Sequence, residues 1–517
     1  MKTFGGVTIG GLLSLSAARH PDKTALISGS ARLSYRQLED LSLGLANGLL
    51  ALGVQKGEKI ALLARNCERF VITHFASAKS GTVLVPLNVN LAGDELVRII
   101  GDSDASVLFF AGEFASGIDA IRGRLAGVNR FVAMDASPPP WAIGFDEALR
   151  SGSSRPAAVA VSEDDDYLIM YTSGTTGTPK GAVLSHRSRV TVALNGVIDY
   201  RMHHEQITVL PVPLYHMGGL NTCLTSHVLS GATVVLLPRF DIGELLRVIE
   251  RERATFLFLA PTPLYAMIDA PAFRSADLSS VRYVMYGGSP MPADAFVRVS
   301  RSLPGVRFIA GYGSTEAGQI SALDWPQHER HAGSAGRPCT LTSVRLIDGA
   351  GRDVGAGDVG EVAVRGPGVM KGYYRQPHAT AEAFRDGWYC TGDLARRDQQ
   401  GMLTIVDRAR DMIVSGAENI YPREIEDVLM THPAIGDAAV FGIPDDRWGE
   451  SVCAAVVLKP GVSTGAQELI DFCRERLAGY KKPRKVQFMD ALPRNSMGKI
   501  VKNLLREPYW RGVDRRI

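Results

Sequence analysis

Residues 171–181 read YTSGTTGTPKG, a stretch of small hydroxyl residues and glycines that ends in a lysine and a glycine. Glycine tolerates positive φ and has no side chain, so the backbone N–H groups of such a loop can curl around an anion. Hydroxyl donors and one cation complete the set, and we interpret the loop as a cradle for a polyphosphate. Its members are Thr172, Ser173, Gly174, Thr175, Thr176, Gly177 and Lys180. The apolar run just before it, residues 167–171, predicts a strand that holds the loop.

The loop has two other interpretations. A Walker A motif requires Gly, four residues and then Gly-Lys-Ser/Thr. Pro179 stands where the second glycine is required, and Gly181 follows Lys180 where the motif needs Ser or Thr, so a P-loop nucleotidase is disfavoured. A mobile Ser/Thr/Gly linker between domains is the remaining alternative, although linkers rarely follow an apolar strand directly.

Length and composition limit the classes of protein to which the chain can belong. At 517 residues it exceeds what one hydrophobic core usually supports, which predicts at least two domains. The net charge of +3 argues against a nucleic-acid partner. The six cysteines are scattered without a CxxC pattern, which favours a reducing, cytoplasmic setting over a disulfide framework or a zinc site. No apolar run approaches the roughly 20 residues of a membrane span, so we expect no transmembrane segment.

The pattern of helices and strands predicts an α/β fold. We interpret the weakly apolar, glycine-rich N-terminus as the first helix of the fold rather than a targeting signal. Asp241 and Glu244 form a capping-box pattern at the start of a helical repeat, and strand-like runs at 233–237 and 255–259 flank this helix. Strand, helix and strand at this spacing predict a βαβ unit in a parallel sheet.

The texture of the sequence changes twice, and the changes predict two domains. Residues 1–407 are expected to form a large N-terminal domain of mixed and parallel sheets with flanking helices. Within it, residues from about 340 to 407 show short β-type stretches separated by glycine turns, which predicts a β-rich subdomain. Residues 408–517 are expected to form a small α+β C-terminal domain, with a helix that begins near Pro422.

A second glycine-rich signal is GYGSTE at residues 311–316. The ring of Tyr312, next to Gly313, can lie on a purine. Thr315 can donate to a phosphate, and Glu316 can hold Mg²⁺ as a hard oxygen ligand. A tight turn with a helix cap explains this stretch about as well.

Three more signals follow along the chain. In WYCTGD, residues 388–393, Asp393 can accept hydrogen bonds from both ribose hydroxyls, although an Asx turn explains it equally well. Residues 407–422 read DRARDMIVSGAENIYP, and residues 493–499 read PRNSMGK. A lone lysine such as Lys499 would ordinarily lie on the surface.

Together these five motifs, in this order, resemble the adenylate-forming superfamily, which contains acyl-CoA synthetases, the adenylation domains of nonribosomal peptide synthetases and firefly luciferase. The resemblance covers essentially the whole chain and is nearest to the stand-alone acyl-CoA synthetases. It implies an AMP-forming carboxylate–CoA ligase whose substrates and activator are ATP, a carboxylic acid, CoA and Mg²⁺. The alternatives are a stand-alone adenylation enzyme that charges a carrier-protein thiol, and a non-catalytic binding protein that kept the fold.

The resemblance also implies roles for the motif residues. The loop at 172–180 would hold the β- and γ-phosphates of ATP, Thr315 would contact the α-phosphate, and Glu316 would hold Mg²⁺. Lys499 would bridge the carboxylate and the α-phosphate, and His216 would lie beside the acyl carboxylate, with a core histidine as its alternative. The remaining nucleotide contacts would be Gly287, Gly288 and Ser289 near the adenine and acyl sites, and Asp393 and Arg408 at the ribose.

For the thioester step, the resemblance implies a mobile C-terminal domain with its hinge near Arg410. Gly416, Ala417 and Glu418 would line the path of the CoA thiol. Ala417 departs from the family, where a second glycine is usual, and its methyl group puts the thiol step in doubt. Lys481 lies in a basic segment, residues 480–484, that either meets the 3′-phosphate of CoA or forms a solvated turn.

The acid is predicted to be monocarboxylic and largely apolar, either a medium- or long-chain fatty acid or an aromatic acid. Gly311, together with Met217, Gly218 and Gly219, would leave space in the acyl site rather than place a charge there. No arginine directly precedes the tyrosine of the GYGSTE stretch to pair with a second carboxylate. A homodimer is a reasonable expectation for this family.

Overall fold

The computed structural model describes residues 7–150, 159–172, 179–415, 418–445, 447–494 and 500–511. The chain divides into two compact units, which we describe separately. Unit 1 comprises Met1–Val344 and Ala363–Cys390, and unit 2 comprises Arg345–Val362 and Thr391–Ile517.

Unit 1 contains a nine-stranded sheet, sheet A, in the order β16-β15-β14-β13-β12-β10-β11-β1-β2. Its strands are β1 (Thr24–Ser28), β2 (Ala31–Ser34), β10 (Ile207–Leu210), β11 (Thr233–Leu236), β12 (Phe256–Leu259), β13 (Tyr283–Gly287), β14 (Arg307–Ser314), β15 (Gly318–Leu323) and β16 (Arg337–Pro338). The six strands from β14 to β1 in this order are mutually parallel, and β2, β15 and β16 are antiparallel additions at the edges. The carboxyl ends of β12, β13 and β14 therefore meet at one edge of the sheet.

The second sheet of unit 1, sheet B, has eight strands in the order β19-β9-β8-β4-β3-β5-β6-β7. Its strands are β3 (Lys59–Leu63), β4 (Val83–Pro86), β5 (Ala105–Phe110), β6 (Arg130–Ala133), β7 (Ile143–Gly144), β8 (Asp166–Thr172), β9 (Lys180–Ser185) and β19 (Gly372–Tyr373). β8 confirms the strand predicted before the glycine-rich loop. β8 and β9 pair antiparallel, whereas β8 pairs parallel with β4.

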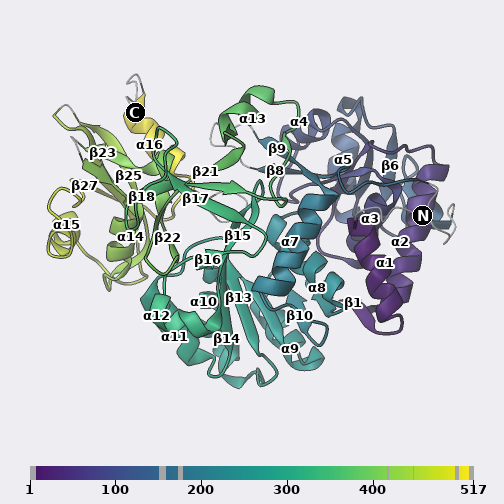
Figure 1. Cartoon of the computed structure of the whole chain (residues 1–517), viewed down its shortest axis with the longest axis horizontal. Coiled ribbons are helices and arrows are strands. Elements are labelled where there is room, and N and C mark those ends of the chain that lie inside the picture. Colours follow the sequence, from purple (N-terminus) through teal and green to yellow (C-terminus); the bar gives the residue numbers. More distant parts are fainter. Residues whose placement is uncertain are drawn as a thin grey trace. The chain divides into compact units, whose positions relative to one another are not determined.

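A layer of helices lies between the two sheets of unit 1 (Figure 1). Within it, α3 contacts β1 of sheet A and β4 of sheet B, and α7 contacts β15 of sheet A and β9 of sheet B. The α-helices of unit 1 as a whole are α1 (Ile9–Arg19), α2 (Tyr35–Ala51), α3 (Glu68–Ser80), α4 (Asp94–Asp102), α5 (Ala115–Ile121), α6 (Phe145–Arg150), α7 (His186–Asp199), α8 (Ser226–Ser230), α9 (Ile242–Glu252), α10 (Pro261–Asp269), α11 (Ala293–Ser302), α12 (Trp325–His331) and α13 (Pro377–Ala383). A π-helix, η3 (Gly218–Thr225), runs directly into α8.

The helix predicted after Asp241 is α9, and the hydrogen bonding of its first turn explains why its start could be predicted from the local sequence. The carboxylate of Asp241 accepts a hydrogen bond from the backbone N–H of Glu244 at 2.8 Å. This bond satisfies one of the donors that the first turn of a helix leaves unpaired. α9 connects β11 to β12, and both strands pair parallel with β10, which confirms the predicted βαβ unit.

Among the described residues of unit 1, four histidines are buried, and we call them the buried histidines. They are His74, His186, His227 and His328. Burial disfavours the charged imidazolium, so it lowers the pKa of His74 to about 3 and the pKa values of the other three to about 4. The hydroxyl of Tyr167 lies 2.7 Å from Nδ1 of His74, which shows how one of these neutral rings is accommodated.

The strands of the β-rich stretch form sheet C, in the order β17-β18-β21-β20 with β22 paired to β21. Its strands are β17 (Ser343–Ile347), β18 (Val359–Arg365), β20 (Phe384–Arg385), β21 (Trp388–Arg397) and β22 (Leu403–Arg408). Sheet C confirms the predicted β-rich character of this stretch.

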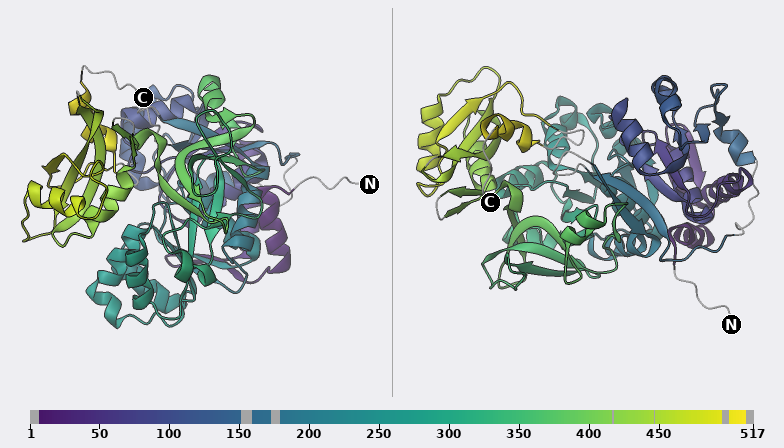
Figure 2. Two further views of the ribbon diagram at one scale, coloured as in Figure 1. Left: turned by 60° about the vertical axis from the view of Figure 1, so that its left-hand side comes forward. Right: turned by 90° about the horizontal axis from the view of Figure 1, so that it is seen from above.

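The C-terminal part of unit 2 is built on sheet D, in the order β24-β23-β26-β25 with β27 paired to β26. Its strands are β23 (Ile413–Ser415), β24 (Glu418–Ile420), β25 (Ile435–Asp445), β26 (Gly449–Leu458) and β27 (Lys485–Phe488), and its helices are α14 (Pro422–Met430), α15 (Ala466–Arg474) and α16 (Lys502–Trp510). α14 and α16 both pack against β25 (Figure 2). The predicted α/β class, with an α+β C-terminal part and a helix beginning at Pro422, is confirmed.

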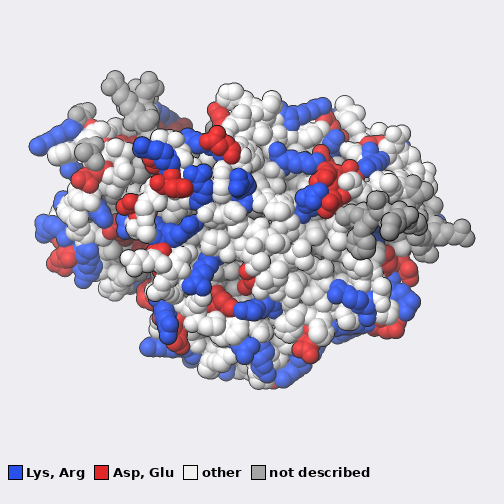
Figure 3. All heavy atoms as spheres, in the orientation of Figure 1, with Lys and Arg blue, Asp and Glu red and all other residues white. Residues whose placement is uncertain are grey.

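In the part of the chain that the structure describes, none of the helices combines the length and the apolar character needed to cross a bilayer. On the face drawn in Figure 3, the basic and acidic side chains are interspersed, so neither sign of charge dominates that face.

Candidate functional site

The glycine-rich loop is closed by a β-hairpin. In the antiparallel pair of β8 and β9, Thr172 lies opposite Lys180, and the Thr172 hydroxyl donates to the backbone carbonyl of Lys180 at 3.4 Å. The register of the hairpin therefore fixes the two ends of the loop next to each other. Five residues predicted to bind phosphate, Ser173, Gly174, Thr175, Thr176 and Gly177, lie outside the described residues.

The structure brings Glu316 to the end of this hairpin. Glu316 lies in the turn between β14 and β15, and its side chain is largely buried. Its Oε1 accepts hydrogen bonds from the hydroxyl of Thr172 at 3.4 Å and from the hydroxyl of Tyr373 at 3.1 Å. Thr315, which is half-buried, precedes it in the same turn. Two motifs that lie 144 residues apart in the sequence therefore meet in space.

Tyr373 is a member of this cluster that the sequence analysis missed. Its ring lies beneath the ammonium of Lys180, with Nζ 5.1 Å from the ring centroid, which is the distance of a cation–π contact. Burial and then the charge of Glu316 raise the pKa of Tyr373, so the phenol stays neutral and remains a hydrogen-bond donor. The only signal in the sequence was an aromatic pair, Tyr373-Tyr374, in a stretch without any recognisable catalytic pattern.

The predicted adenine-binding residues gather at the carboxyl ends of β13 and β14. Gly287 lies opposite Gly311 in these paired strands, and a Cβ on Gly287 would lie 2.5 Å from the Gly311 carbonyl. Gly288 has a φ of +82° and, like Ser289, is exposed. Tyr312 and Gly313 follow Gly311 on β14, so both predicted segments reach the same edge of sheet A. Ligands of parallel α/β sheets bind at this edge.

Next to this edge lie the residues predicted for the acyl site. His216 follows β10 and is half-buried, with its ring 4.5 Å from that of Tyr215, so it is not a fully buried core histidine. A Cβ on Gly218 would lie 3.0 Å from Cε1 of Phe258, and a Cβ on Gly311 would lie 2.7 Å from Cε of Met285. Aromatic and thioether groups therefore flank the two glycines.

Arg189 is a second residue that the sequence did not single out. It lies in α7, is fully buried, and donates to the carbonyl of Gly368 at 2.6 Å and to Sδ of Met217 at 2.9 Å. Burial lowers its pKa to about 9. In the part of the chain that the structure describes, no carboxylate lies within ion-pair distance of its guanidinium. A buried cation therefore joins the 213–219 segment to the 366–370 segment.

In unit 2, the two residues predicted at the ribose lie together. Asp393 on β21 is opposite Arg408 on β22, and the Arg408 Nε lies 3.1 Å from Oδ1 of Asp393. The backbone N–H of Asp393 donates to the hydroxyl of Thr391 at 3.1 Å. The carboxylate is nearly buried, whereas about half of the arginine side chain is exposed.

The other predicted residues of unit 2 are placed as follows. Arg410 lies in the short 3₁₀ turn η5 (Ala409–Asp411), where burial lowers its pKa. Lys481 is engaged in an ion pair, because both carboxylate oxygens of Glu424 lie 2.7 Å from its Nζ. Glu418 is exposed at the start of β24. Gly416, Ala417 and Lys499 lie outside the described residues.

The residues around Glu316 fit a magnesium ion of the kind found with nucleotides. Mg²⁺ usually takes one or two carboxylates and fills its octahedron with water and substrate phosphates. Among the described residues, no cluster of three or more His, Cys, Asp or Glu side chains could form a complete cage. One carboxylate with two hydroxyl neighbours is consistent with an ion that needs a phosphate to complete its coordination.

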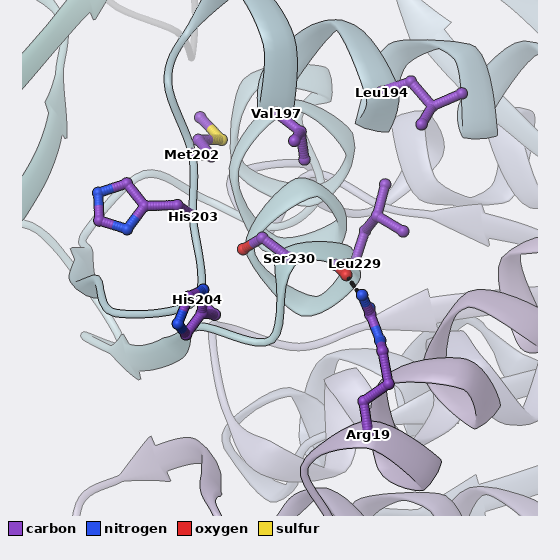
Figure 4. Close-up of a pocket in the computed structure, with 8 residues that line it drawn as sticks. All are labelled: Arg19, Leu194, Val197, Met202, His203, His204, Leu229 and Ser230. Carbon is purple, nitrogen blue, oxygen red and sulfur yellow. Dashed lines mark hydrogen bonds between the residues drawn. The ribbon is translucent and has the colours of Figure 1, made fainter.

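A pocket of about 300 Å³ lies elsewhere in unit 1, at the ends of α1 and α8 (Figure 4). It is lined by residues of these helices, of α7 and of the segment from Met202 to His204. The guanidinium of Arg19 donates to the carbonyl of Leu229 at its rim, at 2.6 Å. None of the predicted catalytic or nucleotide-binding residues lines this pocket.

Comparisons with known proteins agree with the motifs. Residues 13–374 match the AMP-binding enzyme family, and residues 424–499 match the AMP-binding enzyme C-terminal domain. The chain is 40% identical over 498 residues to a feruloyl-CoA synthase from Amycolatopsis sp, covering 95% of this chain and 97% of that protein. It is 37% identical over 513 residues to the long-chain-fatty-acid–CoA ligase FadD13 from Mycobacterium tuberculosis, covering 97% and 98% of the two chains.

Among solved structures, the fold is similar to that of the anthranilate CoA ligase AuaEII in complex with anthranoyl-AMP. The TM-score is 0.89, the sequences are 28% identical, and the alignment covers 97% of each chain.

Proposed function

Because the chain belongs to the AMP-binding enzyme family and is by class an AMP-forming acyl-CoA ligase, we propose that its acid is aromatic and monocarboxylic. The observation that carries the catalytic part of this proposal is the meeting of Thr172, Lys180 and Glu316 at the end of one hairpin. Sequence identity of 40% to a feruloyl-CoA synthase and structural similarity to an anthranilate CoA ligase support the aromatic acid.

In the first step, a carboxylate oxygen of the acid attacks the α-phosphorus of ATP, forms a P–O bond and displaces pyrophosphate. Both reactants are anions, so the site must supply positive charge where negative charge develops. Lys180 at the loop and Lys499 from the C-terminal domain would supply it, and one such preorganised donor is worth about 3 kcal/mol. Mg²⁺ bound at Glu316 would neutralise phosphate charge, and Thr315 would donate to the α-phosphate.

In the second step, the thiolate of CoA attacks the acyl carbon, a C–S bond forms and AMP leaves. We propose that the C-terminal domain, residues 408–517, rotates about a hinge near Arg410 between the two steps. Lys499 would then withdraw, and the segment 416–419 would line the path of the thiol. Gating of this kind lets one site serve two dissimilar reactions.

We propose that the nucleotide end of CoA docks on unit 2. The guanidinium carbons of Arg447 and Arg484 lie 4.8 Å and 5.6 Å from the ring centroid of Trp448, within the range of cation–π contacts. Tyr480, which lies with Arg484 in the basic segment 480–484, is 43% exposed. An aromatic face beside two guanidinium groups suits a purine with a phosphate. Lys481 belongs to this basic segment, but its charge is already shared with Glu424.

For the acid itself, the surroundings of Gly218 and Gly311 supply the argument. Phe258 on β12 and Met285 on β13 are neighbours in paired strands, and they flank the two glycines. Apolar and aromatic side chains favour an apolar ring over a second carboxylate, because an uncompensated buried carboxylate would be costly. A fatty acid is the second candidate, since FadD13 is 37% identical to the chain.

The proposal extends to location and assembly. All six cysteines are free, with no disulfide among them, which is consistent with a reducing cytoplasmic setting. A homodimer remains a proposal that light scattering at micromolar concentration tests directly, and the domain boundary at 407–410 is tested by limited proteolysis.

The decisive experiment measures AMP release from ATP and Mg²⁺ with ferulate, anthranilate, octanoate, palmitate and malonate, each with and without CoA. We expect the aromatic acids to turn over fastest, with acyl-CoA formed only when CoA is present. The Lys180→Met variant should lose activity by about a hundredfold. Lys371→Met is the matched control, because that lysine pairs with Asp166 on the surface. Fastest turnover of malonate would overturn the choice of acid.

Pyrophosphate exchange in the absence of any acyl-CoA product would overturn the choice of thiol. In that case a carrier-protein thiol would be the acceptor.

A further inference from the structure

The segment from Gly366 to Tyr374 is held at several points along its backbone. The carbonyl of Gly368 accepts from Arg189, and the N–H of Met370 donates to the carbonyl of Glu316 at 2.7 Å. The N–H of Tyr374 donates to the carbonyl of Gly181 at 2.7 Å. The same short segment is therefore fixed both to the turn that carries Glu316 and to the hairpin that carries Lys180.

Tyr373 stands between these anchors as part of β19, opposite Ala182 of β9. Its hydroxyl donates to Oε1 of Glu316 at 3.1 Å, and its ring face carries the ammonium of Lys180 at 5.1 Å. Within the described residues, Lys180 and Glu316 form no ion pair with each other. One side chain thus contacts both charged groups, and the ammonium of Lys180 and the carboxylate of Glu316 do not neutralise each other.

This arrangement matters because both charges have to be available to the nucleotide. A lysine and a carboxylate in direct contact would neutralise each other, and separating them when ATP arrives would weaken binding. A phenol avoids this cost, since it offers a hydrogen bond to the anion and a π face to the cation. Groups that orient a metal-binding carboxylate typically change metal affinity or activity by 10- to 100-fold when they are removed.

We propose that Tyr373 is a positioning residue of the nucleotide–metal centre, whose hydroxyl orients Glu316 toward the metal and whose ring keeps Lys180 beside the phosphates. This inference rests on the proposed function, because it assumes that ATP and Mg²⁺ bind at Glu316. It assigns the two roles to different parts of one side chain, so they can be separated by substitution.

Tyr373→Phe removes the hydroxyl and keeps the ring, whereas Tyr373→Leu removes both. Tyr374→Phe is the matched control, because the neighbouring tyrosine also donates to a carboxylate, Asp104, at 2.7 Å and lies outside the cluster. The readout is the Mg²⁺ dependence of ATP binding in the absence of any acid. ATP binding is measured by calorimetry and by the rise in melting temperature that ATP causes. The acid-dependent pyrophosphate exchange is measured in parallel.

For Tyr373→Phe we expect the Mg²⁺ concentration for half-maximal ATP binding to rise at least about 10-fold, with an unchanged melting temperature of the free protein. Tyr373→Leu should in addition raise the Kd for ATP at saturating Mg²⁺, because Lys180 loses its support. Tyr374→Phe should change neither quantity. Combining Tyr373→Phe with Glu316→Gln should give no further rise beyond Glu316→Gln alone, since Tyr373 acts through Glu316.

The proposal is overturned if Tyr373→Phe matches Tyr374→Phe in its Mg²⁺ dependence, or if the effects of Tyr373→Phe and Glu316→Gln multiply. It is also overturned if Tyr373→Phe only lowers the melting temperature of the free protein. These outcomes are independent of the acid, because ATP binding is measured without it. If the wild-type protein binds ATP with Mg²⁺ but converts no acid to acyl-CoA, the proposed function fails and the comparison of variants still decides the role of Tyr373.

Discussion

Replacing Arg506 with leucine is expected to destabilise unit 2 selectively. Arg506 lies in α16, and its guanidinium donates to Oδ1 of Asp411 at 2.7 Å. Only 9% of the Arg506 side chain and 12% of the Asp411 side chain are exposed. Asp411 adjoins Arg410, the predicted hinge residue, and α16 begins shortly after the segment of Lys499. The pair therefore ties the hinge segment to the helix that follows the predicted catalytic lysine.

The size of the effect follows from what the substitution leaves behind. Burial by itself would raise the pKa of Asp411, but the charges of Lys502, Arg506 and Arg410 outweigh it and hold the pKa below its usual value. Breaking a buried pair on one side typically costs about 3–5 kcal/mol, because the other charge stays buried and uncompensated. Lys502 and Arg410 remain near Asp411, so we expect the lower end, about 3 kcal/mol.

Hydrogen–deuterium exchange of the intact protein is the assay, read on the amides of β25 and β26. A loss of about 3 kcal/mol should speed their exchange roughly a hundredfold, while sheets A and B stay unchanged. Arg474→Leu is the matched control, because Arg474 forms an exposed pair with Asp471 in the same unit and should cost below about 1 kcal/mol. Asp411→Asn and the double variant complete a cycle that isolates the coupling between the two side chains.

The reasoning is refuted if Arg506→Leu and Arg474→Leu speed the exchange of β25 and β26 equally. It is also refuted if the double-mutant cycle yields no coupling. Either result would mean that the burial of this pair does not control the stability of unit 2.

Four further predictions concern stability and the two chemical steps. The buried histidines have pKa values of about 3 to 4 in the folded protein, below their unfolded value of 6.5, so unfolding takes up protons. Their contribution to stability should therefore be complete above pH 6.5 and decrease as the pH falls toward 4. Urea titrations should show a loss of up to about 1.4 kcal/mol per pH unit for each ring. Arg484→Glu should raise the KM for CoA at least about 10-fold and leave the KM for ATP unchanged in steady-state kinetics, since a charge reversal near a phosphate costs at least about 1.4 kcal/mol. Gly336→Ala should cost about 2–3 kcal/mol more in chemical denaturation than Gly305→Ala, because both have positive φ but only the Cβ at 336 would clash with backbone, 1.9 Å from a carbonyl oxygen. Ala417→Gly should speed single-turnover thioester formation severalfold without changing pyrophosphate exchange. An unchanged rate of thioester formation would show that the methyl group of Ala417 does not slow the thiol step.

The sequence was most informative where structure is set by near neighbours. Asp241 caps α9 through a residue three positions away, and the apolar run at 167–171 forms β8 because its own pattern requires burial. The motifs also pointed to Glu316 and to Thr172 at the end of β8, which the fold then brings together. Such features depend on spacing, turn chemistry and hydrophobic pattern, all of which are visible in a linear chain.

The features that the sequence did not reveal depend on tertiary packing. Arg189 looks like one more arginine on a polar helix, yet it is fully buried, since it finds a backbone carbonyl 179 residues away. Tyr373 carries no motif, and its role appears only once β19 pairs with β9 and places it beside Glu316. The ion pair of Lys481 with Glu424 likewise depends on a contact 57 residues away. No local pattern encodes these distances.

The buried guanidinium of Arg189 has a consequence for how the enzyme responds to ionic strength. Mobile ions screen exposed charges within about 10 Å at 0.1 M salt, but they do not reach a group sealed inside the protein. The proposed attraction of CoA to exposed Arg484 should therefore weaken as salt is added. The field of Arg189, whose guanidinium touches Met217 beside His216, should persist. Rising salt should then raise the KM for CoA, whereas the electrostatic environment that Arg189 creates at Met217 should change little.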